Sequence, residues 1–170
     1  HPARFILVGT MNPEEGELRP QLLDRFGLSV RIAGIQDPVS RVQIIKYRSA
    51  YDEDPEAFCR SFREQDETVA KKLVDARANL NNVHISDELL LKIAEISVAL
   101  GIDGYRGDLT LMKAIRAYAA LDGREKAEKQ DILKVSHMVF LHRMRSLPFE
   151  QAKSFDPSVI EKILRGEDKP

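Results

Sequence analysis

GTMNPEEGELRPQLLDRFG, residues 9–27, begins at the end of one apolar run of the chain and is followed by another. The first run is Arg4–Thr10, whose last two residues open the stretch, and the second is Leu28–Ile32. A short, continuously apolar run favours a strand that is covered on both faces, as in a parallel α/β sheet. Within the stretch we expect a short helix over about Arg19–Asp24. The segment therefore predicts two strands of a sheet, joined by a loop and a short helix.

Two Asp-Pro pairs mark helix starts further along the chain. Asp37-Pro38 opens one helix and Asp54-Pro55 opens another, with Asp as the N-cap and Pro in the first turn. The second helix runs to about Leu80, and its apolar residues form one narrow stripe on an otherwise charged rod. A helix this long and this polar predicts a link between elements rather than part of a core.

Four further helical segments predict a compact all-helical unit. Ser86 caps the first of them, which ends at Gly101. The next two span about Asp108–Leu121 and Gln130–Arg145, and a short amphipathic helix follows Asp156-Pro157. The predicted fold class is therefore mainly α with a short α/β remnant.

Composition excludes several classes of function. The 170 residues carry 26 basic and 27 acidic side chains, a net charge of -1, which gives no overall attraction to nucleic acid or to an anionic membrane. No run approaches the roughly 20 apolar residues that span a bilayer. A single cysteine, Cys59, and four scattered histidines offer neither a disulfide nor a zinc framework. We therefore expect a cytoplasmic protein that binds no nucleic acid, membrane or structural metal.

Two segments carry a resemblance to a known family. Residues 9–27 resemble, almost throughout, the sensor 1 and arginine-finger region of magnesium-chelatase ATPase subunits, which are AAA+ ATPases. More distant relatives in the MoxR group keep the Asn-Pro and Asp-Arg-Phe elements. The second segment, Leu100–Leu109, contains Gly104-Tyr105-Arg106, which fits the family's glycine, bulky residue and arginine at the start of a lid helix. Family members often have His and Ala where this chain has Tyr105 and Gly107.

Asn12 lies just past the carboxyl end of the first predicted strand, where a parallel sheet presents its ligands. Its amide both donates and accepts hydrogen bonds, so it can orient a water molecule against a γ-phosphate. The resemblance assigns Asn12 this sensor 1 role. Taken alone, an Asn-Pro pair is more often a turn former.

Three arginines have chemistry suited to phosphate. A guanidinium is always charged, so it can neutralise negative charge that develops on a γ-phosphate. The resemblance makes Arg25 the arginine finger, acting in trans on a neighbouring subunit, and Arg106 the sensor 2 residue of the lid. Arg19 is a possible second intersubunit arginine, and a surface ion pair with Glu15 or Glu17 is an equal alternative.

The resemblance also implies a division of the chain and a set of partners. The implied parts are the end of the AAA+ core in residues 1–50, a long linking helix in 51–82, a helical lid in 83–147 and a tail in 148–170. The family forms a homo-oligomeric, hexameric ring and works with a chelatase partner subunit that bears an integrin-like metal-binding domain. Its ATP hydrolysis drives Mg²⁺ insertion into protoporphyrin IX. Whether Arg106 reaches its own nucleotide or a neighbour's stays open, because the long helix precedes the lid.

No Gly-x-x-x-x-Gly-Lys-Ser/Thr loop, which would cradle phosphates, occurs in the sequence. In the family this loop belongs to the upstream AAA+ core of the same chain, where ATP and Mg²⁺ bind. We therefore expect these 170 residues alone to bind no nucleotide and to hydrolyse no ATP.

Other interpretations stay open at the level of sequence. The ATPase could be MoxR-like or cobalt-chelatase-like, or it could be a partner subunit that lends Arg25 without hydrolysing ATP. The helical part could also be a scaffold with no link to nucleotide. Among weaker candidates, His137 and His142 lie five apart and do not share a helix face, and Lys134, Arg143 and Arg145 form a small cluster expected to be solvated.

Overall fold

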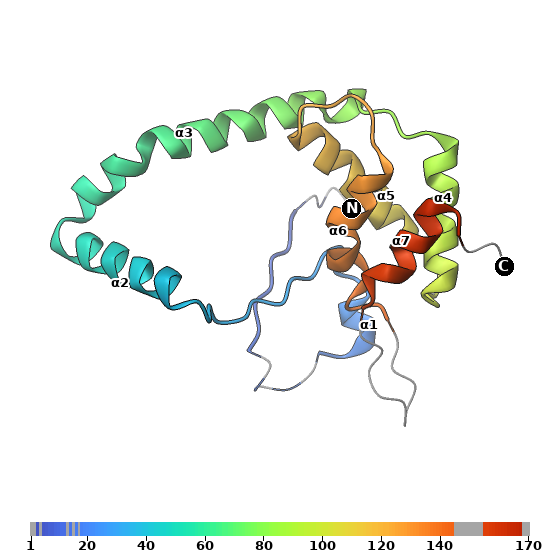
Figure 1. The fold of residues 1–170 in the computed structure, drawn as a ribbon, viewed down its shortest axis with the longest axis horizontal. Coiled ribbons are helices and arrows are strands. Elements are labelled where there is room, and N and C mark those ends of the chain that lie inside the picture. The colour runs from blue at the N-terminus through green and yellow to red at the C-terminus, as the bar shows by residue number, and fades with distance from the viewer. Residues whose placement is uncertain are drawn as a thin grey trace.

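The computed structural model describes residues 3, 5–12, 14, 16, 18–144 and 155–167. Over these ranges the protein is mainly α-helical and consists of an extended arm and a compact bundle (Figure 1). The arm contains α2 (Pro38–Glu53) and α3 (Pro55–Asn79). The bundle contains α4 (Asp87–Ala99), α5 (Arg106–Leu121), α6 (Lys129–Phe140) and α7 (Pro157–Arg165). A one-turn helix, α1 (Pro20–Leu23), precedes the arm and confirms the short helix predicted there.

The two strands predicted around residues 9–27 are wrong for this structure. Phe5–Thr10 and Leu28–Ile32 have no regular secondary structure, and Ile6 and Ile32 are 93% and 91% exposed. A strand is defined by backbone hydrogen bonds to a neighbouring strand, and none lies beside either run in the described part of the chain. Arg4, the first residue of the predicted run, lies outside the described residues.

The predicted helix starts are confirmed, because each N-cap makes the expected bond. Oδ2 of Asp37 accepts from the amide of Ser40 at 2.8 Å, and Oδ1 of Asp54 accepts from the amide of Ala57 at 2.9 Å. Asp156 caps α7, and Ser86 caps α4. A side-chain oxygen at this position satisfies one of the amides that the first helical turn leaves unpaired.

Aromatic rings join the two helices of the arm near their connection. Tyr47 of α2 lies edge-on to Phe58 and Phe62 of α3, with ring centroids 6.0 and 5.6 Å apart, and Tyr51 meets Phe58 at 5.8 Å. Such geometry is favourable for aromatic pairs. Neither arm helix contains a buried residue, although Ala76 near the end of α3 is partly buried against the core of the bundle. The linking role expected of α3 stays a prediction.

The hydrophobic core lies inside the bundle. Helices α4 to α7 each contribute buried aliphatic side chains, and α5 packs against both α4 and α6. The side chains that are fully enclosed include Ile96, Leu111, Ile115, Ile132, Val139, Phe140 and Ile160. Helix α6 ends at Phe140, whereas the sequence predicted a helix to about Arg145, a residue outside the described ones.

A buried ion pair fixes the connection between α5 and α6. Asp131, which is fully buried, accepts from Nη2 of Arg124 at 2.6 Å and from Nη1 at 3.1 Å. It also accepts from the amide of Glu128 at 2.7 Å and thereby completes a capping box at the start of α6. The hydrogen bonds to Asp131 raise the pKa of the Arg124 guanidinium above its usual range. The connection is therefore bonded to the start of α6 through a buried carboxylate.

The end of the arm is attached to this same connection. Nδ2 of Asn79, the last residue of α3, donates to the carbonyl of Arg124 at 3.4 Å. His84 pairs with Lys126 in an isolated parallel bridge, in which the amide of His84 donates to Glu125 and that of Ala127 donates to His84.

In the described part of the chain, no helix has the length and apolar character that crossing a bilayer requires.

Candidate functional site

The candidate site is built at the start of α5. Gly104 has φ 73°, a left-handed conformation that favours glycine, and it turns the chain into the helix. Tyr105, the N-cap residue, makes no side-chain capping bond, so no side chain caps the amides of the first turn at this position. Arg106 is the first helical residue, and its side chain is 53% exposed. The helix dipole and the guanidinium both favour an anion here.

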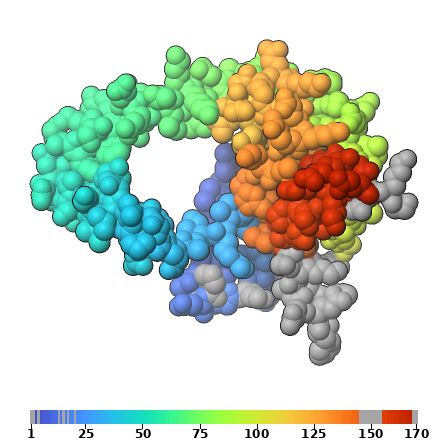
Figure 2. Space-filling view, viewed as in Figure 1, coloured from blue at the N-terminus to red at the C-terminus, as the bar shows by residue number. Residues whose placement is uncertain are grey.

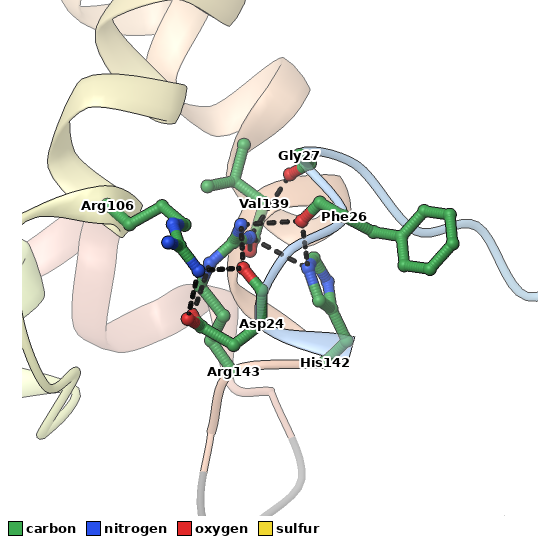
Figure 3. A network of polar contacts seen from close by, with 7 residues as sticks. All are labelled: Asp24, Phe26, Gly27, Arg106, Val139, His142 and Arg143. Carbon is green, nitrogen blue, oxygen red and sulfur yellow. Dashed lines mark hydrogen bonds and ion pairs between the residues drawn. The ribbon is translucent and has the colours of Figure 1, made fainter. Parts of the chain in front are cut away.

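Arg106 is bonded to the segment that follows α1. Its Nη1 lies 2.5 Å from Oδ2 of Asp24 and donates to the carbonyl of Asp24 at 3.2 Å (Figure 3). Both side chains are about half exposed, so water screens the pair, and its net contribution is about 0–1 kcal/mol. Asp24 directly precedes Arg25 in the sequence. The structure therefore brings Arg106 to the loop that carries Arg25.

Arg143, which follows the end of α6, bonds the same loop. Its side chain is only 2% exposed. Nη2 donates to the carbonyl of Phe26 at 2.6 Å, and Nη1 donates to the carbonyl of Gly27 at 3.1 Å and to that of Val139. Nε lies 3.7 Å from Oδ1 of Asp24. The prediction that Arg143 is a solvated surface residue is wrong, because its side chain is enclosed and donates to backbone carbonyls of the 24–27 segment and of α6.

His142 completes this network (Figure 3). Its Nε2 lies 2.8 Å from Nη1 of Arg143 and 3.1 Å from the carbonyl of Phe26. A guanidinium only donates, so its contact with Nε2 is attractive when that nitrogen carries no proton. Burial, with the charge of Arg143 as a smaller cause, lowers the pKa of His142 below its ordinary value. His142 is therefore neutral at neutral pH, and its tautomer decides whether Nε2 accepts from Arg143 or donates to the carbonyl of Phe26.

The other predicted site residues are exposed. Oδ1 of Asn12 accepts from the amide of Glu14 at 3.5 Å, a contact within its own turn, and Arg19 and Arg25 both face solvent. Glu15 and Glu17, the alternative partners of Arg19, lie outside the described residues. Gly9 and Phe26, from the two ends of residues 9–27, lie close together. A Cβ added at Gly9 would lie 3.5 Å from the Phe26 ring.

Sequence reasoning missed two members of the network, Asp24 and Arg143. Asp24 carries a local signal, because an acidic residue next to a predicted arginine finger can pair with a second arginine. Arg143 carries none, because its partners in the loop are backbone carbonyls more than a hundred positions earlier in the chain. No group of three or more His, Cys, Asp or Glu side chains that could hold a metal ion occurs in the described ranges.

Comparison with known proteins shows the family. The model of the AAA lid domain matches residues 90–163, which include all of α5 and α6. Magnesium-chelatase subunit ChlI of Mesostigma viride is 47% identical over 154 residues, and the match covers 91% of this chain and 43% of the relative. Over this length the chain belongs to the magnesium-chelatase ChlI-like AAA+ family. It corresponds to the C-terminal lid region of those proteins.

Two further relatives extend this result. The chloroplastic magnesium-chelatase subunit ChlI of Oryza sativa subsp. indica is 44% identical over 154 residues, which is 91% of this chain and 37% of that protein. The crystal structure of a candidate ATPase from Cytophaga hutchinsonii superposes with a TM-score of 0.62 at 20% identity, covering 88% of this chain and 48% of that one. The second likeness supports the fold alone. This ChlI-like chain spans less than half the length of the curated relatives it matches.

Proposed function

We propose that the whole protein is the ATPase motor subunit of a magnesium-chelatase-type complex, and that this chain supplies its sensor, arginine-finger and lid residues. The observation that carries the proposal is the bond between Arg106 and Asp24. Arg106 is the first residue of the lid helix α5, and Asp24 is the neighbour of Arg25. The bond therefore brings together the segments that carry Arg106 and Arg25, the two arginines that suit a terminal phosphate. The family relationship supports the assignment, because the relatives are named magnesium-chelatase subunits.

The residues of the site fit a nucleotide phosphate. Arg106 is half exposed at a helix start that lacks a side-chain cap, and Arg25 is exposed one residue beyond Asp24. In the whole protein we assign Asn12 to sensor 1, Arg25 to the arginine finger in trans, Arg106 to sensor 2 and Arg19 to a second intersubunit arginine. ATP with Mg²⁺ supplies the phosphoryl group and the metal charge. Arg106 and Asn12 orient it, and Arg25 neutralises the charge that develops during transfer.

The bond between Asp24 and Arg106 is weak enough to exchange. A half-exposed ion pair contributes about 0–1 kcal/mol, whereas a phosphate carries more charge and accepts from a guanidinium in a bidentate manner. A terminal phosphate therefore displaces the Asp24 carboxylate from Arg106 at little cost. Release of Asp24 changes the restraint on Arg25, so the lid helix and the finger loop respond to the same event.

The remaining parts of the proposal concern the complete protein. We assign residues 1–50 to the end of its AAA+ core, 51–82 to the linking helix, 83–147 to the lid and 148–170 to the tail. Its partners are the upstream core of the same chain, further copies in a ring, and a chelatase subunit with an integrin-like domain. The reaction served is Mg²⁺ insertion into protoporphyrin IX. We assign the complete protein to the cytoplasm. The rice relative, by contrast, is named as chloroplastic.

The test uses the full-length protein with saturating ATP and Mg²⁺. Arg25→Ala lowers kcat for phosphate release by about 10³-fold or more, as removal of an arginine finger does generally. Arg106→Ala and Asn12→Ala also lower it. Arg63→Ala, an exposed arginine on α3, is the matched control and leaves turnover unchanged. Unchanged turnover in all three site variants would instead support the scaffold interpretation.

A mixing experiment tests the action in trans. Arg25→Ala subunits keep an intact phosphate loop, and subunits mutated in that loop keep Arg25. Each preparation alone is inactive, and mixed rings regain activity because one subunit lends Arg25 to the site of the other. Mixed rings that stay as inactive as the separate preparations contradict the proposed role of Arg25.

A further inference from the structure

The loop of residues 24–27, Asp24-Arg25-Phe26-Gly27, carries Arg25 and is bonded mainly to side chains of the bundle. The short helix α1 ends at Leu23, directly before it, and Leu28–Ile32, directly after it, has no regular secondary structure. Its carbonyls at positions 24, 26 and 27 face the guanidinium of Arg143 (Figure 3). Beyond this loop, the amide of Ser29 donates to the carbonyl of Met138 at 2.8 Å. The loop is therefore attached to the end of α6.

Arg143 is suited to this attachment because it belongs to the bundle. It follows the last turn of α6, its amide donates to the carbonyl of Phe140 at 2.9 Å, and its Nη1 donates to the carbonyl of Val139. The carbonyl end of a helix favours a positive charge. A Cβ added at Gly107 of α5 would lie 3.8 Å from Cδ of Arg143, so the side chain runs close beneath the start of the lid helix. One side chain thus bonds both α6 and the loop, close to the start of α5.

We propose that Arg143 is a positioning residue for Arg25. Its guanidinium fixes the backbone of the 24–27 loop to the bundle, so that the loop and the lid move as one body. The inference deepens the proposed function and rests on it for the role of Arg25. Arg143 itself touches no phosphate, since its side chain is 2% exposed, Nη1 and Nη2 donate to the carbonyls, and Nε, which makes no hydrogen bond, is buried 3.7 Å from Oδ1 of Asp24.

The planar fork of arginine is required at this position. Nη1 and Nη2 donate to the carbonyls of Gly27 and Phe26, which are different groups in different directions. A lysine ammonium keeps the charge but concentrates its donors at one point. Both Arg143→Lys and Arg143→Met therefore release the loop, whereas only Arg143→Met removes the charge. Charge alone does not restore the position of Arg25.

A double-mutant cycle in the full-length protein tests whether Arg143 acts through Arg25. Arg143→Met and Arg143→Lys each lower kcat by about 10 to 100-fold, because misplacing a reacting group by about 1 Å has such effects, while the Kd for nucleotide stays nearly constant. In the Arg25→Ala background, Arg143→Met changes the single-turnover rate by less than about twofold. Lys134→Met, an exposed position on α6, is the control and leaves kcat unchanged.

The outcomes separate this inference from the proposed function. If Arg25→Ala retains full kcat, the proposed function fails. If Arg25→Ala lowers kcat but Arg143→Met leaves it unchanged, only the role of Arg143 fails. The role of Arg143 also fails if the double variant loses kcat by the product of the two single losses. Arg143 and Arg25 would then act independently, and Arg143 would not position Arg25.

Hydrogen exchange on the unsubstituted full-length protein tests the attachment of the loop directly. It does not depend on whether any Arg143 variant folds. If the loop and the bundle form one body, the amide of Ser29 exchanges about as slowly as that of Leu141, which donates to His137 in the last turn of α6. Exchange of Ser29 at the rate of a free peptide, beside a protected α6, overturns the proposal. In Arg143→Lys we expect Ser29 to lose its protection while α5 keeps its own.

Discussion

The arm and the bundle are both built from amphipathic helices, yet only the bundle has a core. In the arm, α2 and α3 contain no buried residue, and Ile45 and Val74 are 68% and 66% exposed. In the bundle, Ile96, Leu111 and Ile115 are completely enclosed. Figure 2 shows an opening between the arm and the rest of the molecule. A helical period therefore predicts a helix, whereas burial depends on a partner surface.

The largest expected difference between the two regions comes from truncating a leucine in each. Leu111→Ala in α5 removes a fully enclosed side chain and lowers the opening free energy of the bundle by about 2–5 kcal/mol, because a cavity remains. Leu73→Ala in α3, where the side chain is 55% exposed, changes the stability of the arm by about 0.5 kcal/mol or less. Hydrogen exchange of α5 and α3 amides measures both. Equal losses would contradict the comparison.

A second contrast concerns ion pairs. Asp131→Ala leaves Arg124 without its buried partner and removes the capping bond of α6, so we expect a loss of about 3 kcal/mol from the bundle. Asp52→Ala breaks an exposed pair with Arg48 on α2, which contributes roughly 0.2–0.5 kcal/mol. Denaturant unfolding of each variant gives the two values. A small effect of Asp131→Ala would show that water replaces the carboxylate.

The smallest expected effect is a response to mildly acidic pH that comes from His142 in the bundle. The arm contains no histidine, while burial lowers the pKa of His142 below its ordinary value of 6.5. On acidification the unfolded chain takes up this proton before the folded protein does. The stability of the loop attachment is therefore complete above about pH 6.5 and falls as the pH drops toward the folded-state pKa.

Exchange of the Ser29 amide between pH 7.5 and pH 5, corrected for the intrinsic rate, measures this effect. Ser29 reports it because its amide is bonded to Met138 beside the attachment. His142→Gln removes the titrating ring and abolishes the pH dependence. A Ser29 amide that becomes better protected in acid would show the sign to be wrong.

Local chemistry explains what the sequence predicted correctly. Asp37, Asp54, Ser86 and Asp156 each act on amides two or three positions away, so the helix starts can be read without knowledge of the fold. The resemblance of residues 9–27 identified the family, which the comparisons confirm. The roles assigned to Asn12, Arg19, Arg25 and Arg106 stay predictions.

Long-range partners explain what the sequence did not predict. Residues 5–10 and 28–32 have the composition of buried strands, but a strand forms only beside another strand. Arg143 has the composition of a surface residue, but the carbonyls of Phe26 and Gly27 lie close to it in the fold. In both cases the deciding group is remote in sequence, and no local pattern specifies it.

The arm is held at both of its ends. On one side Ser29, which residues 30–37 separate from α2, is bonded to Met138 near the end of α6, and on the other Asn79 is bonded to Arg124 in the connection between α5 and α6. Between these points the helices α2 and α3 pack on each other. A push on the tip, where Tyr51 meets Phe58, therefore reaches the bundle as a pair of forces applied at two separate places.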